Sequence, residues 1–207
     1  MSGMYSKLPH YVYLNKEKFA INTDYHIFID FEEEMQGDET YKAIMKVLQR
    51  FYHPFFFDIC NKGYFKEAID KFIWFYKCGK PENYVNNFKN GNKSQIFSYK
   101  HDDLYIWAAF KQIYNVDLNH ENIHWWKFRA MFISLPSNCE FVKIKGYRAY
   151  NGKDKNLLEL KEIHKLPLNG SQIKDQIRRK QIYEALKQKS QEKRWFYGCS
   201  WIINIWY

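Results

Sequence analysis

Apolar residues recur at helical spacing along most of the chain, and this periodicity limits the fold more than any other feature of the sequence. Between Phe65 and Tyr76 they repeat every three or four residues, which places them on one face of a helix. The segment 121–135 is apolar on nearly every side, as is typical of a helix at the centre of a core. The pattern therefore predicts a mainly α fold, a single helical domain of about seven to eight helices.

Two short runs in which polar and apolar residues alternate precede the first helix. They span residues 11–22 and flank a polar turn, which predicts a small N-terminal β-hairpin. Ser137 and Glu140 have the spacing of a capping box, and we expect them to begin a short helix that ends at Gly146. The longer helices are expected at about 24–36, 38–52 (with Tyr41 on its apolar side), 65–76, 102–114, 121–135 and 157–166, with a polar loop at 80–98.

Composition divides the chain into three parts. Residues 1–168 carry the helical pattern and the hairpin, and we expect them to form the core domain. Residues 169–194 predict a long basic helix with a thin apolar seam. Residues 195–207 are almost wholly apolar, so this tail is expected to be buried, to bind a partner or to come from a shifted reading frame.

The composition is that of a folded, unexported protein. Hydrophobic residues make up 46% of the chain and aromatic residues 20%, a density that excludes a disordered chain. No segment reaches the roughly 18 to 20 apolar residues of a membrane span, and no export leader is found, so neither a membrane nor secretion is expected. The four cysteines form no C-x-x-C pair, which favours reduced thiols over disulfides or a zinc ribbon.

The formal net charge of +9 is concentrated towards the C-terminal end. The segment 142–194 contains 15 Lys or Arg and 6 Asp or Glu residues, whereas the rest of the chain contains 17 of each sign. Near the other end, the segment 30–39 holds six acidic residues, Glu32, Glu33 and Glu34 among them, and no basic residue. Adjacent helical residues point in different directions, so this run predicts a solvated or partner-facing surface and not a metal or general-acid cluster.

The string from His120 to His124 formally matches H-E-x-x-H, in which two imidazoles one helical turn apart bind zinc beside a general base, here Glu121. It falls at the expected start of a helix, so we expect His120 to face solvent and His124 to pack among aromatic residues, with no metal bound. No nucleotide-binding loop or nucleophile elbow is present. We therefore expect no catalytic residue, no cofactor and no small-molecule substrate, and the chain is not predicted to be an enzyme.

One block of the sequence has a highly unusual composition, Ile123-His-Trp-Trp-Lys-Phe-Arg-Ala-Met-Phe-Ile-Ser-Leu-Pro136. This block resembles a family of bacteriophage proteins known as the Gp-fifteen family. The resemblance covers about residues 11–185 and leaves the apolar tail without a family interpretation. Further segments that resemble the family, in the same order, lie at 20–24, 68–79, 105–110 and 161–167.

The resemblance implies a tail-region protein of long-tailed phages of Gram-positive bacteria, with a gene position similar to that of tail assembly chaperones. Such chaperones bind the helical tape-measure protein while the tail tube polymerises around it. The expected function is a non-enzymatic tail assembly chaperone in the cytoplasm of the infected host, with the tape-measure protein and the tail tube protein as partners. The oppositely charged ends either make copies associate head to tail as homo-oligomers or only keep the protein soluble.

The residues expected to contact partners combine the charged ends with the family-like aromatic block. Two alternatives stay open: a structural component of the tail or connector, and a nucleic-acid-binding phage regulator that uses the basic C-terminal helix. The candidate partner-binding residues are Glu32, Glu33, Glu34, Trp125, Trp126, Lys127, Arg129, Arg178, Arg179 and Trp201.

Overall fold

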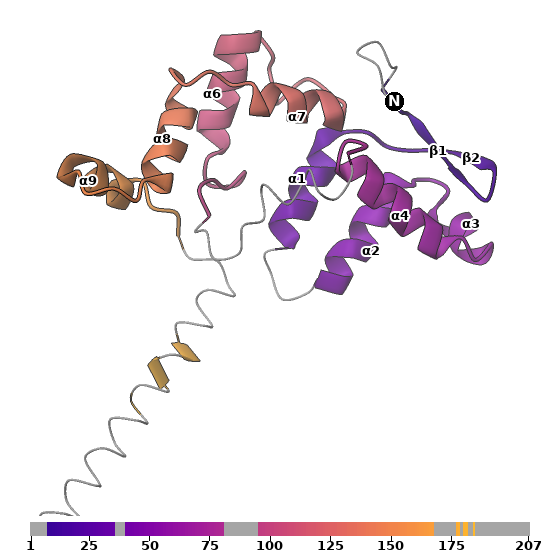
Figure 1. The fold of residues 1–207 in the computed structure, drawn as a ribbon. Helices are drawn as coiled ribbons and strands as arrows, with labels where there is room; N and C mark the ends of the chain where they lie inside the picture. The colour runs from indigo at the N-terminus through magenta and orange to yellow at the C-terminus, as the bar shows by residue number, and fades with distance from the viewer. Residues whose placement is uncertain are drawn as a thin grey trace, which may run out of the picture. The chain divides into compact units, whose positions relative to one another are not determined.

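The computed structural model describes residues 8–35, 40–80 and 95–167, together with Ile177, Arg178, Lys180, Gln181 and Glu184, which are helical. Contacts divide the chain into two units, the first made of residues 1–35 and 39–167 and the second of residues 36–38 and 168–207. In the described part, the first unit contains eight α-helices and one antiparallel hairpin (Figure 1). The predicted mainly helical fold with a small N-terminal hairpin is confirmed.

The hairpin opens the first unit and the helices follow it along the chain. None of the described helices has the length and apolar character that crossing a membrane would require. The elements are β1 (Tyr11–Leu14), β2 (Glu17–Ala20), α1 (Tyr25–Glu34), α2 (Thr40–Phe51), α3 (Phe56–Asn61), α4 (Phe65–Tyr76), α6 (Asp103–Tyr114), α7 (Trp125–Ile133), α8 (Glu140–Ala149) and α9 (Lys155–Ile163).

The hairpin forms because its two turn residues adopt left-handed backbone conformations. Asn15 and Lys16 have φ angles of 44° and 68°, the two positive values that a type I′ turn requires. The antiparallel register places Val12 opposite Phe19, and both side chains are buried. One face of the hairpin therefore packs on the core while the other faces solvent.

Aromatic side chains fill the core, and Trp125 of α7 and Phe28 of α1 are fully buried within it. Their rings stack with centroids 4.8 Å apart. Phe128, one turn further along α7, stacks on Phe110 of α6 at 5.1 Å and on Tyr25 of α1 at 4.5 Å. The prediction that α7 is a core helix is confirmed, because its buried side chains pack against both α1 and α6.

Helix α7 begins later than its sequence pattern predicts. The expected start near Glu121 is wrong, because the helix begins at Trp125 and His124 occupies its N-cap position. The His124 Nδ1 atom accepts a hydrogen bond from the backbone N–H of Trp126 at 3.1 Å. A ring nitrogen thus takes the capping role that a short polar side chain more often has.

Three further local predictions are corrected by the structure. Helix α8 continues through Gly146 and has Cys139 at its N-cap, so the expected capping box at Ser137 does not form. Helix α3 has no counterpart among the predicted helices. Tyr41, expected on the apolar side of α2, is 72% exposed. The side of α2 that packs on the core includes Ala43 and not Tyr41.

Candidate functional site

Two acidic residues of α1 form ion pairs with α2. The Arg50 Nη1 atom donates a hydrogen bond to Asp30 Oδ2 at 2.6 Å, and the ammonium group of Lys46 pairs with the Glu34 carboxylate. All four side chains lie at the surface of the first unit, so these pairs are screened by water and salt. They nevertheless give Asp30 and Glu34, two of the four acidic residues described in the run 30–39, intramolecular partners.

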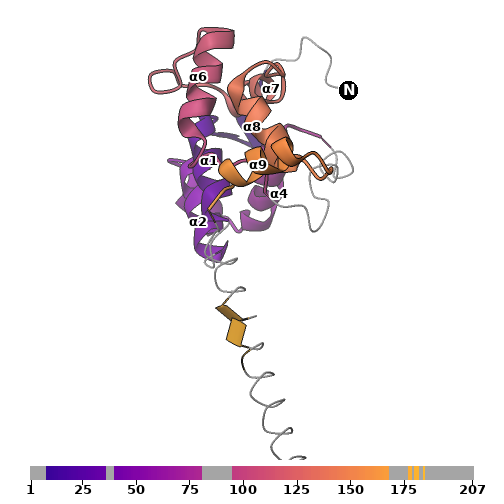
Figure 2. The same ribbon diagram turned by 90° about the vertical axis from the view of Figure 1, so that its left-hand side faces the viewer.

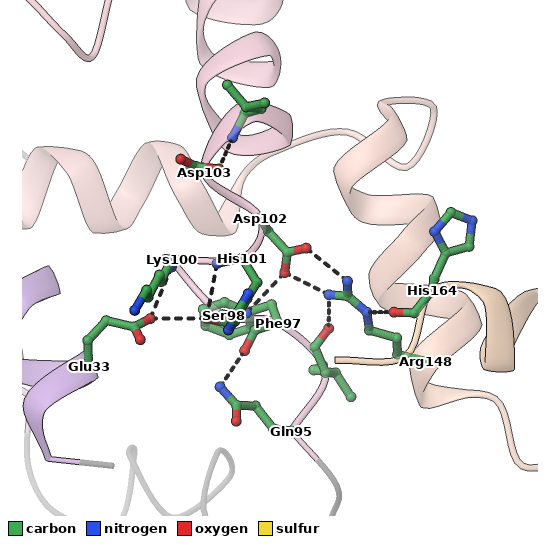
Figure 3. A network of polar contacts seen from close by, with 12 residues as sticks. Glu33, Gln95, Phe97, Ser98, Lys100, His101, Asp102, Asp103, Arg148 and His164 are labelled. Atoms are coloured by element: carbon green, nitrogen blue, oxygen red, sulfur yellow. Dashed lines mark hydrogen bonds and ion pairs between the residues drawn. The ribbon is translucent and has the colours of Figure 1, made fainter. Parts of the chain in front are cut away.

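Glu33 faces the segment that leads into α6. Its Oε1 atom accepts hydrogen bonds from the Ser98 hydroxyl at 3.2 Å and from the backbone N–H of Lys100 at 3.1 Å (Figure 3). The carboxylate therefore fixes a stretch of backbone 65 residues away in sequence. Glu33 thus has intramolecular partners in addition to its half-exposed position on the acidic run.

Glu32 points into the fold and meets another candidate partner-binding residue, Arg129. The Tyr76 hydroxyl donates a hydrogen bond to Glu32 Oε1 at 2.8 Å, and Arg129 Nη1 lies 3.6 Å from the same oxygen. The Arg129 guanidinium also lies over the Trp125 ring, 5.3 Å from its centroid. The structure thus brings together three residues that were expected to bind partners, but it brings them together inside the protein.

Tyr99 lies near the Glu32–Arg129 pair. Its hydroxyl and the Arg129 Nε atom are buried and have no hydrogen-bond partner among the described residues. Burial raises the pKa of Glu32 above its ordinary value, and the Tyr76 hydrogen bond and the Arg129 charge only partly oppose this rise. Burial likewise raises the pKa of the Tyr99 hydroxyl and of the nearby Cys78 thiol. Burial therefore shifts each of these groups towards its neutral form.

The two adjacent tryptophans of α7 cap the C-terminal end of α4. The Trp125 indole N–H donates to the carbonyl of Tyr76 at 2.9 Å, and the Trp126 indole N–H donates to the carbonyl of Phe75 at 2.8 Å. These carbonyls belong to the last turn of α4, where no intrahelical donor is available. Trp125 is fully buried and cannot serve as an anchor for a partner, whereas Trp126 is partly exposed.

The remaining candidate residues fall into two groups. Lys127 on α7 and Arg178 in the second unit are exposed. Arg179 and Trp201 lie outside the described residues. Of the ten candidates, the structure therefore leaves Lys127, Arg178 and the outer part of Trp126 open to a partner, with Glu34 engaged in a surface ion pair.

The H-E-x-x-H string does not lie on one helix. His120 is exposed in the turn before α7, where its Nδ1 atom lies 3.4 Å from Asp117 Oδ2, and the backbone N–H of Asp117 donates to Glu121 at 2.9 Å. Both ring nitrogens of His124 are engaged, Nδ1 as the cap of α7 and Nε2 with the carbonyl of Pro9 at 3.0 Å. No three His, Cys, Asp or Glu side chains in the described ranges are grouped to hold a metal ion.

A buried ion pair that sequence reasoning missed joins α6 to α8. The Arg148 guanidinium makes two hydrogen bonds to the Asp102 carboxylate, at 2.6 and 2.8 Å (Figure 3). Arg148 also donates to the carbonyls of His164 at 2.5 Å and Ile96 at 3.2 Å, and Asp102 accepts from the Ser98 backbone N–H at 3.0 Å. The only sequence signal was the helix expected to begin at Asp102, and the side chain of this N-cap residue makes no capping hydrogen bond.

Several exposed aromatic and aliphatic side chains lie on the hairpin, α3 and α4. The outer face of β1 presents two tyrosines whose rings meet edge to face at 5.7 Å. On α3, Phe57 is 72% exposed. Exposed apolar side chains are the ones through which proteins commonly contact partners. The exposed set on these elements comprises Tyr11, Tyr13, Phe57, Ile73 and Trp74.

Comparison with known families identifies the chain. Residues 4–167 match the family described as Bacteriophage Gp15 protein, and the protein belongs to this family. The resemblance carried by the block around Trp125 and Trp126 is thereby confirmed, and the chain is a bacteriophage protein. Searches of curated proteins and of solved structures gave no match.

Proposed function

We propose that this protein is a tail assembly chaperone that binds the phage tape-measure protein while the tail tube forms, without catalysing a reaction. Its membership of the Gp15 family carries the proposal. Its partners are then the tape-measure protein and the tail tube protein, and its place of action is the cytoplasm of the infected host. It requires no cofactor and no small-molecule substrate.

The exposed aromatic set on the hairpin, α3 and α4 supplies a physical basis for client binding. A long amphipathic helix presents apolar side chains at spacings of three and four residues, and aromatic side chains on a partner cover such a stripe. Tyr13, Phe57 and Trp74 project from three different elements and are 51%, 72% and 40% exposed. These residues replace buried Trp125 as the expected anchors.

Surface contacts join the hairpin to α4 and to the residue that follows α3. Glu17 of β2 accepts a hydrogen bond from the Lys62 ammonium, just after α3, at 2.6 Å. The backbone N–H of Asn15 donates to Glu67 of α4 at 2.8 Å. A surface that is already ordered loses little conformational entropy when a client binds, which supports useful affinity from a modest contact area.

Co-expression with the tape-measure protein tests the proposal. The full chain should keep the tape-measure protein soluble and be recovered with it, and mass spectrometry of purified virions should not find it. Replacing Phe57 and Trp74 together by serine should reduce recovery of the client roughly tenfold. Leu158→Ser is the matched control, because Leu158 is as exposed as Trp74 but lies on α9.

Two outcomes would contradict the proposal. If the protein is found in virions and does not bind the tape-measure protein, it is a structural component of the tail. If the client is recovered equally with the double variant and with the control, the exposed aromatic set is not the binding surface. Circular dichroism of both variants separates loss of binding from loss of folding.

A further inference from the structure

The outer face of α6 is apolar although it faces solvent. Leu104 is 74% exposed and Tyr105 42% exposed, and Ala108, one turn further on, is exposed as well. These three positions lie on one stripe of the helix, since residues three and four apart are neighbours on a helix surface. Lys111 and Gln112, both exposed, continue the stripe, which carries no acidic side chain.

Packing on the opposite face of α6 explains how the helix is anchored but not why this stripe is apolar. Ile106, Ala109 and Phe110 are buried in the core. The Trp107 indole N–H donates to Asp117 at 3.0 Å and the Tyr114 hydroxyl donates to the carbonyl of Met131 at 2.8 Å. The helix is thus rigidly held, and Figure 2 shows it at an edge of the first unit.

We propose that α6 is a self-association surface that pairs antiparallel with α6 of a second copy of this chain, with Ala108 at the crossing point. The inference is independent of the proposed client, because it concerns the purified protein alone. Its basis is that the two ends of the stripe differ and are complementary when a twofold axis passes through Ala108. The apolar pair Leu104 and Tyr105 precedes that residue by four and three positions, and Lys111 and Gln112 follow it by three and four.

A twofold axis through Ala108 makes these residues complementary. It places Tyr105 of each copy opposite Lys111 of the other, an arrangement in which the ammonium group meets the negative face of the ring. Leu104 then packs on the aliphatic part of Gln112. The small side chain of Ala108 lets the two helices approach to the short end of the usual interaxial range, about 8 Å.

Charge also favours the antiparallel arrangement over a parallel one. Antiparallel helices bring each positive N-terminal end beside a negative C-terminal end, whereas a parallel pair would set the two Lys111 ammonium groups side by side. The contact is small, because a helix of 12 residues is only about 18 Å long. The dimer is therefore a weak one that forms only at high protein concentration.

Cysteine cross-linking of the full chain tests the pairing and its register. Ala108→Cys should form a disulfide between copies, because the two residues meet at the axis. Leu104→Cys alone should not, since its copies would be about 12 Å apart along the helices, beyond the reach of a disulfide. A mixture of Leu104→Cys and Gln112→Cys chains should give mixed dimers.

Peptide mapping by mass spectrometry distinguishes these links from any that involve native cysteines, two of which, Cys60 and Cys78, are partly exposed. Disulfides between two Leu104→Cys chains would overturn the antiparallel register. Absence of both the Ala108→Cys link and the mixed link would overturn the proposal.

Analytical ultracentrifugation gives a second, independent measurement. Ala108→Arg should weaken the concentration-dependent self-association roughly tenfold or more, because two bulky cations would meet at the axis. Ala130→Arg is the matched control, since Ala130 is an exposed alanine within another helix, α7. Equal association of the two variants would contradict the proposed surface, as would a wild-type protein that stays monomeric at millimolar concentration.

Discussion

Two of the arginine–carboxylate pairs in the first unit, one with its arginine on α8 and the other with its arginine on α7, differ in almost every respect. Arg148 and Asp102 form a bidentate contact at 2.6 and 2.8 Å, with side chains 9% and 1% exposed. Arg129 and Glu32 approach only to 3.6 Å, at exposures of 27% and 21%. Arg129 Nε also lacks a hydrogen-bond partner within the described part of the chain.

The difference shows what a protein must supply in order to bury a charge. Removing two ions from water costs several kcal/mol each, and only short contacts with every donor satisfied offset that cost. For the Arg148 pair, the carbonyls of Ile96 and His164 take up donors that Asp102 does not reach. In the looser pair, Arg129 Nε has no such acceptor among the described residues. Burial raises the pKa of Glu32, and the long contact to Arg129 only partly opposes this rise.

Breaking the tighter pair should have the largest effect. Arg148→Met leaves the Asp102 carboxylate buried without a counter-charge, and we expect the free energy of unfolding to fall by about 3 to 5 kcal/mol. Urea denaturation followed by circular dichroism measures this. Adding Asp102→Leu to the variant should restore part of the loss, because the stranded charge is removed. A loss below about 1 kcal/mol would show that the pair is more hydrated than its geometry implies.

Breaking the looser pair should cost much less. Arg129→Met keeps an aliphatic side chain over Trp125 and removes a contact that is already long, so we expect a loss of about 1 kcal/mol or less. A double-mutant cycle with Glu32→Gln should give a coupling energy smaller than the cycle for Asp102 and Arg148. Equal coupling energies in the two cycles would contradict the contrast between the pairs.

The pH dependence of stability should separate the pairs further. Because the pKa of Glu32 in the folded protein is raised above 4.5, the folded state binds its proton more tightly than the unfolded state. The contribution of Glu32 to the free energy of unfolding is therefore fully present below pH 4.5, and it is lost as the pH rises through the pKa of Glu32 in the folded protein. The stability of the wild type relative to Glu32→Gln should fall over this range. A difference that stays constant or grows with pH would show that the pKa of Glu32 is not raised.

The smallest effect is expected for the surface pair between α1 and α2. Asp30→Asn removes a 2.6 Å contact to Arg50, but both side chains are well exposed. We expect a loss below about 1 kcal/mol that disappears in roughly 1 M NaCl, because salt screens exposed charges. Thermal unfolding at low and high salt measures the difference, and a loss that persists in high salt would indicate a role beyond charge pairing.

The fold could be predicted from local sequence patterns wherever the pattern is long. The helix at 65–76 and the hairpin follow directly from their periodicities, and both are confirmed. Helix α3 has only six residues, which is too short for a helical repeat to stand out. The start of α7 was misplaced because its cap is a histidine, His124, which sequence rules do not count among capping residues.

The candidate site could be predicted only in part, because charge pairing depends on residues distant in sequence. Glu33 is hydrogen-bonded to Ser98, 65 residues away in sequence, and Asp102 is hydrogen-bonded to Arg148, 46 residues away. A run of acidic residues indicates a charged surface, but no local pattern shows which carboxylate turns inward. Trp125 likewise is of a residue type that is common at interfaces, but it is buried in the core.

Helix α9 packs against α8 but has no buried residue. Arg148 donates to the carbonyl of His164 at 2.5 Å, and the Lys161 ammonium donates to the carbonyl of Tyr150 at 2.7 Å. Opening α9 exposes little apolar surface, so it requires far less free energy than global unfolding. Its amide protons should exchange with deuterium before those of α7, and proteases should cut the chain at this helix while the aromatic core is still intact.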